Sequence, residues 1–409
     1  SSKIAEVLEE LDPSESVEIL EELPEEEIVK ILENMSVDEI IDLFQEMPTT
    51  QAEHLLAKLP KEDYEELKKL LKMAEDTAGG LMTTDYVYIF ADETVNQAIE
   101  DARKFGQEAE TIYYLYVVDN KKHLQGVLSL RELIAAPRDK KIKDIMHTNV
   151  ISVKVDDDQE EVAKIISRYG LLAVPVVDDN NRLLGIVTVD DAMEVLEAEN
   201  TEDIHKMAGI TTEEDVLLNS SVWEASKRRI FWLIVCLFGD MISGKVIDGY
   251  SSVIQSVVAV AFFIPVLMAT GGNIGTQSLA LTVRGIATEE LNKKNLFKFI
   301  LGETLAGLQL GIICGAIISL VAYTWQQDIK LSAAVGLAMC FSLTVASLVG
   351  VLIPLLFNLM SIDPAVASGP FITTVVDIIT LLIYFTLSVN LIEIFNVQNS
   401  IVQQIGVIV

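Results

Sequence analysis

Cysteine and histidine are scarce in this chain, with three and four copies among 409 residues. The cysteines, Cys236, Cys314 and Cys340, show no CxxC spacing, so neither a disulfide framework nor a zinc site is indicated. All four histidines precede residue 206, ahead of the long apolar stretches, so those stretches lack the imidazole ligands that suit several later transition metals.

Basic residues are also few, with 30 Lys and Arg against 61 Asp and Glu, a formal net charge of −31. Nucleic-acid binding depends on neutralising phosphates, so this balance excludes a nucleic-acid partner and favours cations. No paired nucleophile and base and no phosphate-binding loop are found, so an enzyme is not predicted. No charged segment followed by a short apolar one opens the sequence, and we expect the N-terminal part to remain inside the cell.

The charge is unevenly distributed. Residues 1–215 hold 51 acidic and 21 basic residues, whereas residues 216–409 hold 10 and 9. Half of all residues are hydrophobic, which is high for a chain of this charge. The sequence therefore predicts an acidic soluble half joined to a nearly neutral apolar half.

The N-terminal part contains a twelve-residue repeat. Leu11, Leu23, Met35, Met47 and Leu59 recur at this spacing, mostly just before a proline. Each repeat places Pro, Ser or Asp at a helix start, acids in the first turn and apolar residues in the second. We expect a small superhelix of short helices over residues 1 to 77.

Two similar segments follow, at 81–133 and 145–192. Each has a strand, an amphipathic helix, a "VVD" strand, a turn, a "GV/IxS/T" strand and a final helix. This β-α-β-β-α order resembles the CBS domain pair, a regulatory module. By that resemblance Thr188 and Asp191 of "GIVTVDD" contact a nucleotide ribose, whereas the first copy has Ser129 and Glu132, so at most one ATP-type site is expected. The alternative is that Thr188 only caps the last helix.

Apolar stretches long enough to cross a bilayer recur from Ile230 onward. We place five spans near 229–250, 253–282, 297–322, 331–358 and 371–394. Basic residues precede the first span and separate the second from the third, which by the positive-inside rule puts both regions in the cytoplasm. The C-terminus is then outside a multi-pass cell membrane protein. The basic residues are Lys227, Arg228, Arg229, Arg284, Lys293, Lys294 and Lys298.

Ionisable residues inside the spans are functional candidates, because a charge in hydrocarbon costs a few kcal/mol. Asp240 lies in the first span, Glu303 near the cytoplasmic end of the third, and Asp377 roughly 10 Å into the fifth helix. No Lys or Arg lies in mid-span except Lys245, near the outer end of the first. Asp377 is therefore the strongest candidate. The third span also carries Gly307, Gly311 and Gly315 at four-residue intervals, a stripe predicted to serve helix packing.

The second span contains the stretch "ATGGNIGTQ" after Pro265, which is expected to kink the helix. Irregular backbone at membrane depth is tolerated where it lines a water-filled path. We expect the glycines, including Gly272, to expose carbonyls to such a path, with Asn273, Thr276 and Gln277 adding neutral oxygens. A carboxylate with carbonyl, amide and water oxygens suits a hydrated Mg²⁺.

The whole chain resembles the MgtE magnesium channels through "PVLMATGGNIGTQS", "EDIHK" and "DPAVASGP…TTVVDIITLLIYF". The resemblance implies a multidomain membrane protein with an α-superhelical domain, tandem α/β CBS domains and an all-α transmembrane domain. The domains are then an acidic superhelix at 1–77, CBS 1 at 78–140, CBS 2 at 141–199, an acidic connecting (plug) helix at 200–228, and a five-helix pore domain at 229–409.

The resemblance further implies a homodimer in the lipid bilayer, with a pore on the dimer axis lined by the second and fifth spans. Asp377 would be the selectivity carboxylate, with Gly272 and Thr276 lining the pore. Cytosolic Mg²⁺ would bind a set of gating carboxylates and close the channel. Thr276 and Gly369 stand where relatives can carry Asn. The gating carboxylates are Asp191, Glu194, Glu199, Glu202, Asp203 and Asp363.

Two acidic soluble halves would repel one another and their connecting helices at low Mg²⁺, and ions bridging carboxylates would draw them together. The connecting segment adds three further acids, Glu213, Glu214 and Asp215. The main alternative is a CBS-regulated transporter of another divalent cation such as Co²⁺, Mn²⁺ or Zn²⁺. A CBS-gated anion channel is disfavoured, because the intramembrane Asp has no matching basic site.

Overall fold

The computed structural model describes residues 2–8, 11, 13–106, 109–211, 222–292 and 294–406. Lys293 and the acids Glu213, Glu214 and Asp215 lie outside the described residues. The chain forms two compact units, Ser1–Glu199 and Asn200–Val409. Each is described by itself below.

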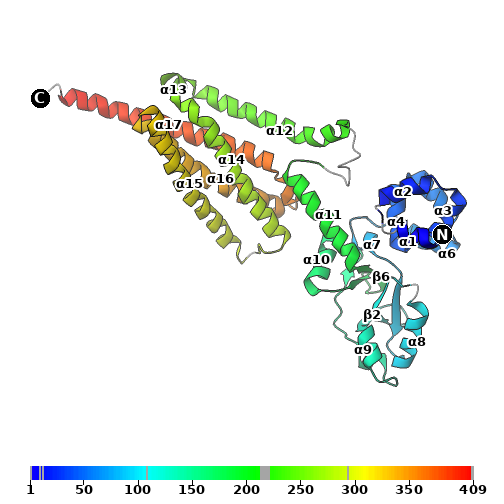
Figure 1. Ribbon diagram of the computed structural model, residues 1–409. Coiled ribbons are helices and arrows are strands. Elements are labelled where there is room, and N and C mark those ends of the chain that lie inside the picture. Colours follow the sequence, from blue (N-terminus) through cyan, green and yellow to red (C-terminus); the bar gives the residue numbers. More distant parts are fainter. Residues whose placement is uncertain are drawn as a thin grey trace. The chain divides into compact units, whose positions relative to one another are not determined.

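The first unit begins with six short helices, and the last five of them correspond to the predicted repeat (Figure 1). Pro24, Pro48 and Pro60 are the N-cap residues of three of them, and Ser36 is that of a fourth. The recurring Leu and Met residues lie between helices and pack in or against the core, with Met47 only 4% exposed. The helices are α1 (Ser2–Leu8), α2 (Pro13–Glu21), α3 (Glu25–Leu32), α4 (Val37–Glu46), α5 (Thr49–Leu56) and α6 (Lys61–Leu70).

Two three-stranded sheets follow, and both have the predicted β-α-β-β-α order. In each sheet the first two strands are parallel and the last two antiparallel. The first copy comprises α7 (Ala78–Leu81), β1 (Tyr86–Phe90), α8 (Val95–Phe105), β2 (Thr111–Val118), β3 (Leu124–Ser129) and α9 (Leu130–Ala135). The second comprises η1 (Ile142–Asp144), β4 (Val153–Lys154), α10 (Gln159–Tyr169), β5 (Ala173–Val177), β6 (Leu183–Thr188) and α11 (Val189–Met207).

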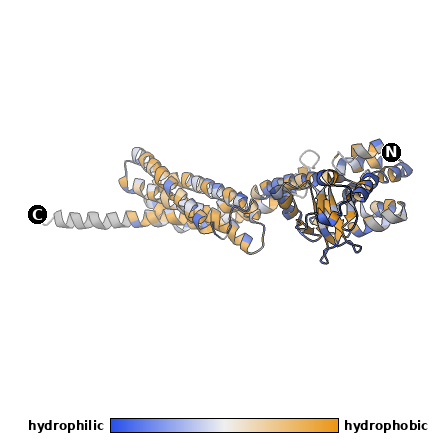
Figure 2. Ribbon diagram, turned by 90° about the horizontal axis from the view of Figure 1, so that it is seen from below, coloured by the Kyte–Doolittle hydropathy of each residue, from blue (hydrophilic) through white to orange (hydrophobic). Residues whose placement is uncertain are grey.

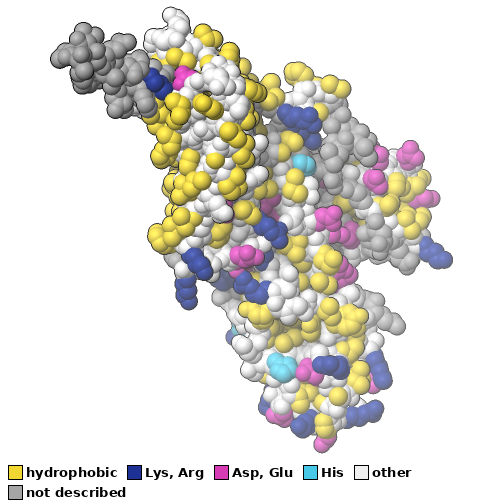
Figure 3. All heavy atoms as spheres, turned by 60° about the vertical axis from the view of Figure 1, so that its left-hand side comes forward, with side chains coloured by type: hydrophobic (Ala, Val, Ile, Leu, Met, Phe, Trp, Pro, Cys, Tyr) yellow, Lys and Arg dark blue, Asp and Glu magenta, His cyan; other side chains and the backbone are white. Residues whose placement is uncertain are grey.

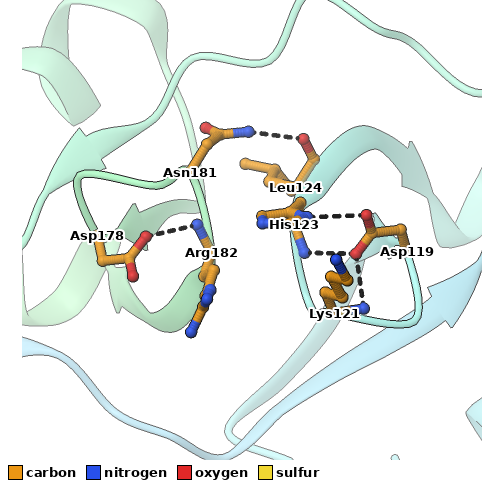
Figure 4. A network of polar contacts seen from close by, with 7 residues as sticks. All are labelled: Asp119, Lys121, His123, Leu124, Asp178, Asn181 and Arg182. Carbon is orange, nitrogen blue, oxygen red and sulfur yellow. Dashed lines mark hydrogen bonds and ion pairs between the residues drawn. The ribbon is translucent and has the colours of Figure 1, made fainter.

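The turns between the last two strands hold the two copies together (Figure 4). Asn181 Nδ2 donates to the Leu124 carbonyl at 2.9 Å, and the Leu124 amide donates to the Asn181 carbonyl at 2.9 Å. In the first turn Asp119 Oδ2 lies 2.8 Å from His123 Nδ1, and this hydrogen bond lowers the pKa of Asp119 to about 2. The tandem modules therefore pair through their equivalent turns.

The predicted boundary between CBS 2 and the connecting helix at 199/200 falls inside α11. Residues 200–207 continue that helix, and the chain turns at Gly209, whose φ is +74°. The remainder of the predicted connecting helix includes residues 212–221, which are outside the described residues.

The second unit is a bundle containing five helices long and apolar enough to cross a membrane. Hydrophobic residues run along these helices (Figure 2) and cover much of the bundle surface seen in Figure 3. The candidate spans are Ala225–Gly249, Ala259–Ala287, Leu296–Gln326, Ile329–Leu359 and Gly369–Leu391. They lie in α12 (Val222–Gly249), α14 (Ala259–Ala287), α15 (Leu296–Gln326), α16 (Ile329–Leu359) and α17 (Gly369–Gly406), with α13 (Ser251–Ser256) and η2 (Pro364–Val366) between them.

The second span differs from its predicted bounds of 253–282. A separate short helix, α13, occupies the start of that range, and Val257 is in a non-helical conformation with φ −139°. The span therefore begins at Ala259 and extends to Ala287. Val253 and Ile254 of α13 continue the apolar run, so composition alone did not reveal the turn.

The glycine stripe of the third span serves packing, as predicted. A Cβ at Gly311 would lie 2.6 Å from the Cys340 carbonyl oxygen, and one at Gly315 would lie 2.5 Å from the Gly336 oxygen. Gly307 meets Ser347 in the same way. The backbones of α15 and α16 thus approach each other closely along this stripe.

Candidate ion path and regulatory region

Asp377 lies on α17, about one turn after the residues through which this helix contacts α12 and α14. Thr374, three residues earlier, packs against Gly239 of α12, where an added Cβ would collide with Thr374 Cγ2. Thr373, four residues earlier, packs against Gly272 of α14. The Asp377 side chain is partly buried, and its Oδ1 atom is buried with no hydrogen-bond partner among the described residues. A carboxylate in this setting requires a ligand, water or cation.

The glycines of "ATGGNIGTQ" do not interrupt the second span, contrary to our expectation. The helix α14 is continuous from Ala259 to Ala287, and Gly271, Gly272 and Gly275 are buried. A Cβ at Gly272 would lie 2.7 Å from Thr373 Cγ2, and the carbonyl of Gly275 lies against Gly350 of α16. The glycines permit close packing of α14 on α17 and α16. The Gly275 carbonyl is therefore packed against protein.

The polar side chains of the same stretch occupy a different face of α14. Asn273 and Gln277 are exposed and lie four residues apart, so they share one face of the helix. Thr276 is partly buried, and its Oγ1 donates to the Asn273 carbonyl at 2.9 Å. These side chains, rather than glycine carbonyls, supply the neutral oxygens of this segment.

Two of the predicted gating carboxylates share one lysine. Lys206 Nζ lies 2.5 Å from Glu202 Oε1 and 2.7 Å from Asp363 Oδ2. Burial lowers the pKa of Lys206, but the hydrogen bonds and charges of the two carboxylates outweigh burial and raise it overall. Asp363 Oδ1 also accepts the Ala365 amide at 2.8 Å. The end of α11 is thereby joined to the loop before α17.

The other predicted carboxylates of α11 have different surroundings. Glu194 is exposed at its surface, and partial desolvation by its neighbours, followed by repulsion from Asp191 and other nearby acids, raises its pKa. Glu199 Oε1 accepts Gln159 Nε2 at 2.9 Å. Asp203 lies on the same helix. Among the described residues no group of three or more Asp, Glu, His or Cys could hold a metal ion, so the structure does not gather these acids into one centre.

The candidate nucleotide residues form a hydrogen-bonded pair. Thr188 Oγ1 and the Thr188 amide both donate to Asp191 Oδ2, at 2.5 and 3.1 Å. In the first copy Ser129 donates to Glu132 in the same way, at 2.6 Å from Oγ and 3.0 Å from the amide. Both pairs lie at the start of the final helix of their copy, which is the capping arrangement.

Comparisons with known proteins cover all of these parts. The description "MgtE intracellular N domain" matches residues 1–76, "CBS domain" matches 78–139 and 142–198, and "Divalent cation transporter" matches 264–387. The magnesium transporter MgtE of Enterococcus faecalis is 44% identical over 80% of this chain and 72% of its own length. The chain belongs to the MgtE family.

Other MgtE proteins are similar over comparable lengths. The magnesium transporter MgtE of Bacillus subtilis is 42% identical over 77% of this chain and 70% of its own length, and that of Thermus thermophilus is 39% identical over 80% and 73%. Among solved structures, the cytosolic domain of the Mg²⁺ channel MgtE in complex with ATP is 42% identical, covering 47% of this chain and 78% of its own, with a TM-score of 0.46.

This MgtE protein contains features that our reading of the sequence missed. Lys206 is not among the predicted site residues, because its bridging of Glu202 and Asp363 depends on a contact between residues 157 positions apart. Gly239 was not singled out, although it allows α12 to touch Thr374. A small residue directly before an intramembrane acid could have indicated this contact.

Proposed function

We propose that this MgtE protein carries Mg²⁺ across the membrane along a path beside α14 and α17, with Asp377 as the carboxylate that selects the ion. The family model that matches residues 264–387 is described as a divalent cation transporter, and the matched relatives are named magnesium transporters. The observation that carries the proposal is the buried Asp377 Oδ1 atom, which has no protein partner among the described residues. A hydrated cation supplies the missing partner and the opposite charge.

The path is formed by two copies of the chain. In a single copy Asn273 and Gln277 are exposed on a membrane-spanning helix, where lipid would leave their amides without hydrogen bonds. A second copy that covers this face gives the amides a protein or water environment. A homodimer with α14 near its axis is therefore the arrangement that supports transport best.

Closure by cytosolic Mg²⁺ acts through the end of α11. Within the second unit, the Met207 carbonyl and Thr276 both lie beside Gly369, because a Cβ there would be 3.3 Å from Met207 O and 3.4 Å from Thr276 Cγ2. A shift of residues 202–207 is thus transmitted to the first turn of α17 and to α14. The ions that produce this shift bind the carboxylates of α11, namely Asp191, Glu194, Glu199, Glu202 and Asp203, and Asp363 of the loop before α17.

Because several weak sites act together, neutralising Asp191, Glu202 and Asp203 in one variant should leave the protein open at high internal Mg²⁺. The acidic soluble half is on the cytoplasmic side in this scheme, and the C-terminus is outside. A variant that closes like the parent would show that these acids are not the sensor.

An adenine nucleotide bound at Thr188 and Asp191 is a second regulatory ligand of the CBS pair. Binding would replace the short hydrogen bond between these residues with contacts to ribose hydroxyls. Titration of ATP into the full-length protein, compared with Asp191→Asn, tests this site. Equal binding by the two proteins would place the nucleotide elsewhere.

Ion flux into liposomes containing the purified full-length chain tests the transport proposal. We expect Mg²⁺ uptake in the parent, loss of uptake in Asp377→Asn, and unchanged uptake in Asp328→Asn, which alters an N-cap acid between α15 and α16. Parallel measurements with Co²⁺, Mn²⁺ and Cl⁻ address the alternatives. Faster Co²⁺ or Mn²⁺ than Mg²⁺ uptake would favour a transporter of another divalent cation, and Mg²⁺ uptake that survives Asp377→Asn would contradict the path.

A further inference from the structure

Helices α12 and α17 run side by side and parallel (Figure 1). Gly239 touches Thr374, and further along the Tyr250 ring stacks on Phe385 with centroids 4.8 Å apart. From one contact to the next both segments advance by the same eleven residues, from Gly239 to Tyr250, which directly follows α12, and from Thr374 to Phe385. The two helices therefore stay in register between these contacts.

This register places a second acid at the level of Asp377. Asp240 follows Gly239 by one residue, and Asp377 follows Thr374 by three, so the two residues differ by roughly 3 Å along the helix axis. Asp240 lies close enough to act electrostatically on Asp377. Among the described residues neither acid has an ion-pair partner or a hydrogen bond to its side chain.

Ser243 of α12 lies at nearly the same height along the helix axis as Asp377. It lies four residues after Gly239, on the face that contacts α17, and the register puts it opposite Ile378, next to Asp377. Ser243 is only 3% exposed, and its Oγ atom is buried with no hydrogen-bond partner among the described residues. A buried hydroxyl without a partner beside two carboxylates indicates a ligand or water that the protein alone does not supply.

The electrostatics of this pair also require a cation. Asp240 is exposed on α12 and Asp377 is partly buried, and two carboxylates at one level of membrane-spanning helices repel each other where little water screens them. Lys245, the nearest basic residue on α12, lies five residues beyond Asp240 and is exposed, and within the part of the chain that the structure describes it forms no ion pair with either acid. Carboxylate, hydroxyl and water oxygens together form the ligand set that a hard divalent cation prefers.

We propose that Asp240 and Ser243 of α12 complete the cation site at Asp377, so that a hydrated divalent cation is held between two helices by two carboxylates. The inference rests on the transport function proposed above and adds the first span to the ion path. Asp240 sets the affinity for the entering ion, whereas Asp377 remains essential for its passage.

The test compares Asp240→Asn with the parent in liposomes containing the full-length protein, over a range of external Mg²⁺. We expect the half-saturating Mg²⁺ concentration to rise roughly 10- to 100-fold, as when a supporting carboxylate is removed from a metal site, with near-parental flux at saturation. Asp240→Glu, which keeps the charge, should restore a value near that of the parent. Asp248→Asn is the matched control, since Asp248 is an exposed acid two turns further along α12.

The outcomes separate this inference from the transport proposal. Absence of Mg²⁺ flux in the parent would overturn both. Flux that is lost in Asp377→Asn but has the same half-saturation in Asp240→Asn and Asp248→Asn would overturn only the role of Asp240. If Asp240→Asn does not fold, Ser243→Ala tests the site instead. Removal of the Ser243 hydroxyl should raise the half-saturating Mg²⁺ concentration. An unchanged concentration would contradict the proposed site.

Discussion

Gly369 and Thr276 face each other at the start of α17. A Cβ at Gly369 would lie 3.4 Å from Thr276 Cγ2 and 3.3 Å from the Met207 carbonyl oxygen. The two positions at which the family resemblance led us to expect Asn in relatives thus lie side by side, and the end of α11 packs against Gly369. A small residue at 369 allows the three segments to meet.

Gly369→Val should weaken closure by internal Mg²⁺. The added methyl groups must push Met207 or Thr276 away, because the space around the Cβ position is already tight. We expect the Mg²⁺ concentration that half-closes the protein to rise about fivefold, which corresponds to about 1 kcal/mol. Flux through liposomes of controlled internal Mg²⁺ measures this change. Gly302→Val is the control, since a Cβ at Gly302 meets no atom within 4 Å.

Lys206→Met should loosen the end of α11 in the absence of Mg²⁺. The lysine is partly exposed, so its ion pairs with Glu202 and Asp363 are worth about 1 kcal/mol. Hydrogen exchange of residues 200–211 should then speed up about fivefold. Added Mg²⁺ should restore protection in the variant, because the freed carboxylates bind the ion. Lys298→Met is the control. If residues 200–211 exchange equally fast in the two variants, the ion pairs of Lys206 do not hold the end of α11.

A hydroxyl network joins three of the spans. Ser278 Oγ donates to Glu303 Oε2 at 3.0 Å and lies 2.9 Å from Ser347 Oγ, which donates to the Glu303 carbonyl at 2.8 Å. Ser347→Ala should lower the free energy of unfolding by roughly 0.6 to 1.7 kcal/mol, the range for hydrogen bonds between membrane helices. Thermal unfolding in detergent measures the loss.

Ser342 provides the matched control for this network. It is a buried serine on the same helix, α16, and its Oγ has no partner among the described residues. Ser342→Ala should therefore leave stability unchanged or raise it, because an unsatisfied polar group is removed. Equal effects of the two substitutions would mean that the network contributes nothing.

Glu132 should make the first unit sensitive to acid. The hydrogen bond from His147, followed by those from Ser129, lowers the pKa of Glu132 to about 2. A carboxyl with a lower pKa in the folded than in the unfolded state stabilises the fold above its ordinary pKa of 4.5, and this stability is lost as the pH falls toward 2. In Glu132→Gln the melting temperature should depend less on pH in this window.

Circular dichroism of the full-length protein at several pH values within that window measures the effect. Glu161→Gln, which changes an exposed carboxyl on α10, is the control and should retain the pH dependence of the parent. If Glu132→Gln retains it as well, acid sensitivity arises from other groups.

The sequence by itself determined the order of the parts. Charge separated the two halves, the twelve-residue spacing of Leu and Met located the short helices, and alternation of strand and helix patterns revealed the CBS pair. These signals are local, because burial of one helix face or one strand face imposes a period on neighbouring residues. The apolar runs likewise located five spans, apart from the turn after α13.

Only the tertiary structure decided which faces meet. Glycine makes the backbone more flexible, and it also leaves room for a neighbouring helix because it has no side chain. The sequence could not tell which of these properties matters in "ATGGNIGTQ". The contact of Gly272 with Thr373 shows that the missing side chain is what permits close packing. Likewise, the pairing of Lys206 with Asp363 and the alignment of Asp240 with Asp377 join residues far apart in the chain. Such contacts depend on how helices pack, which no local period encodes.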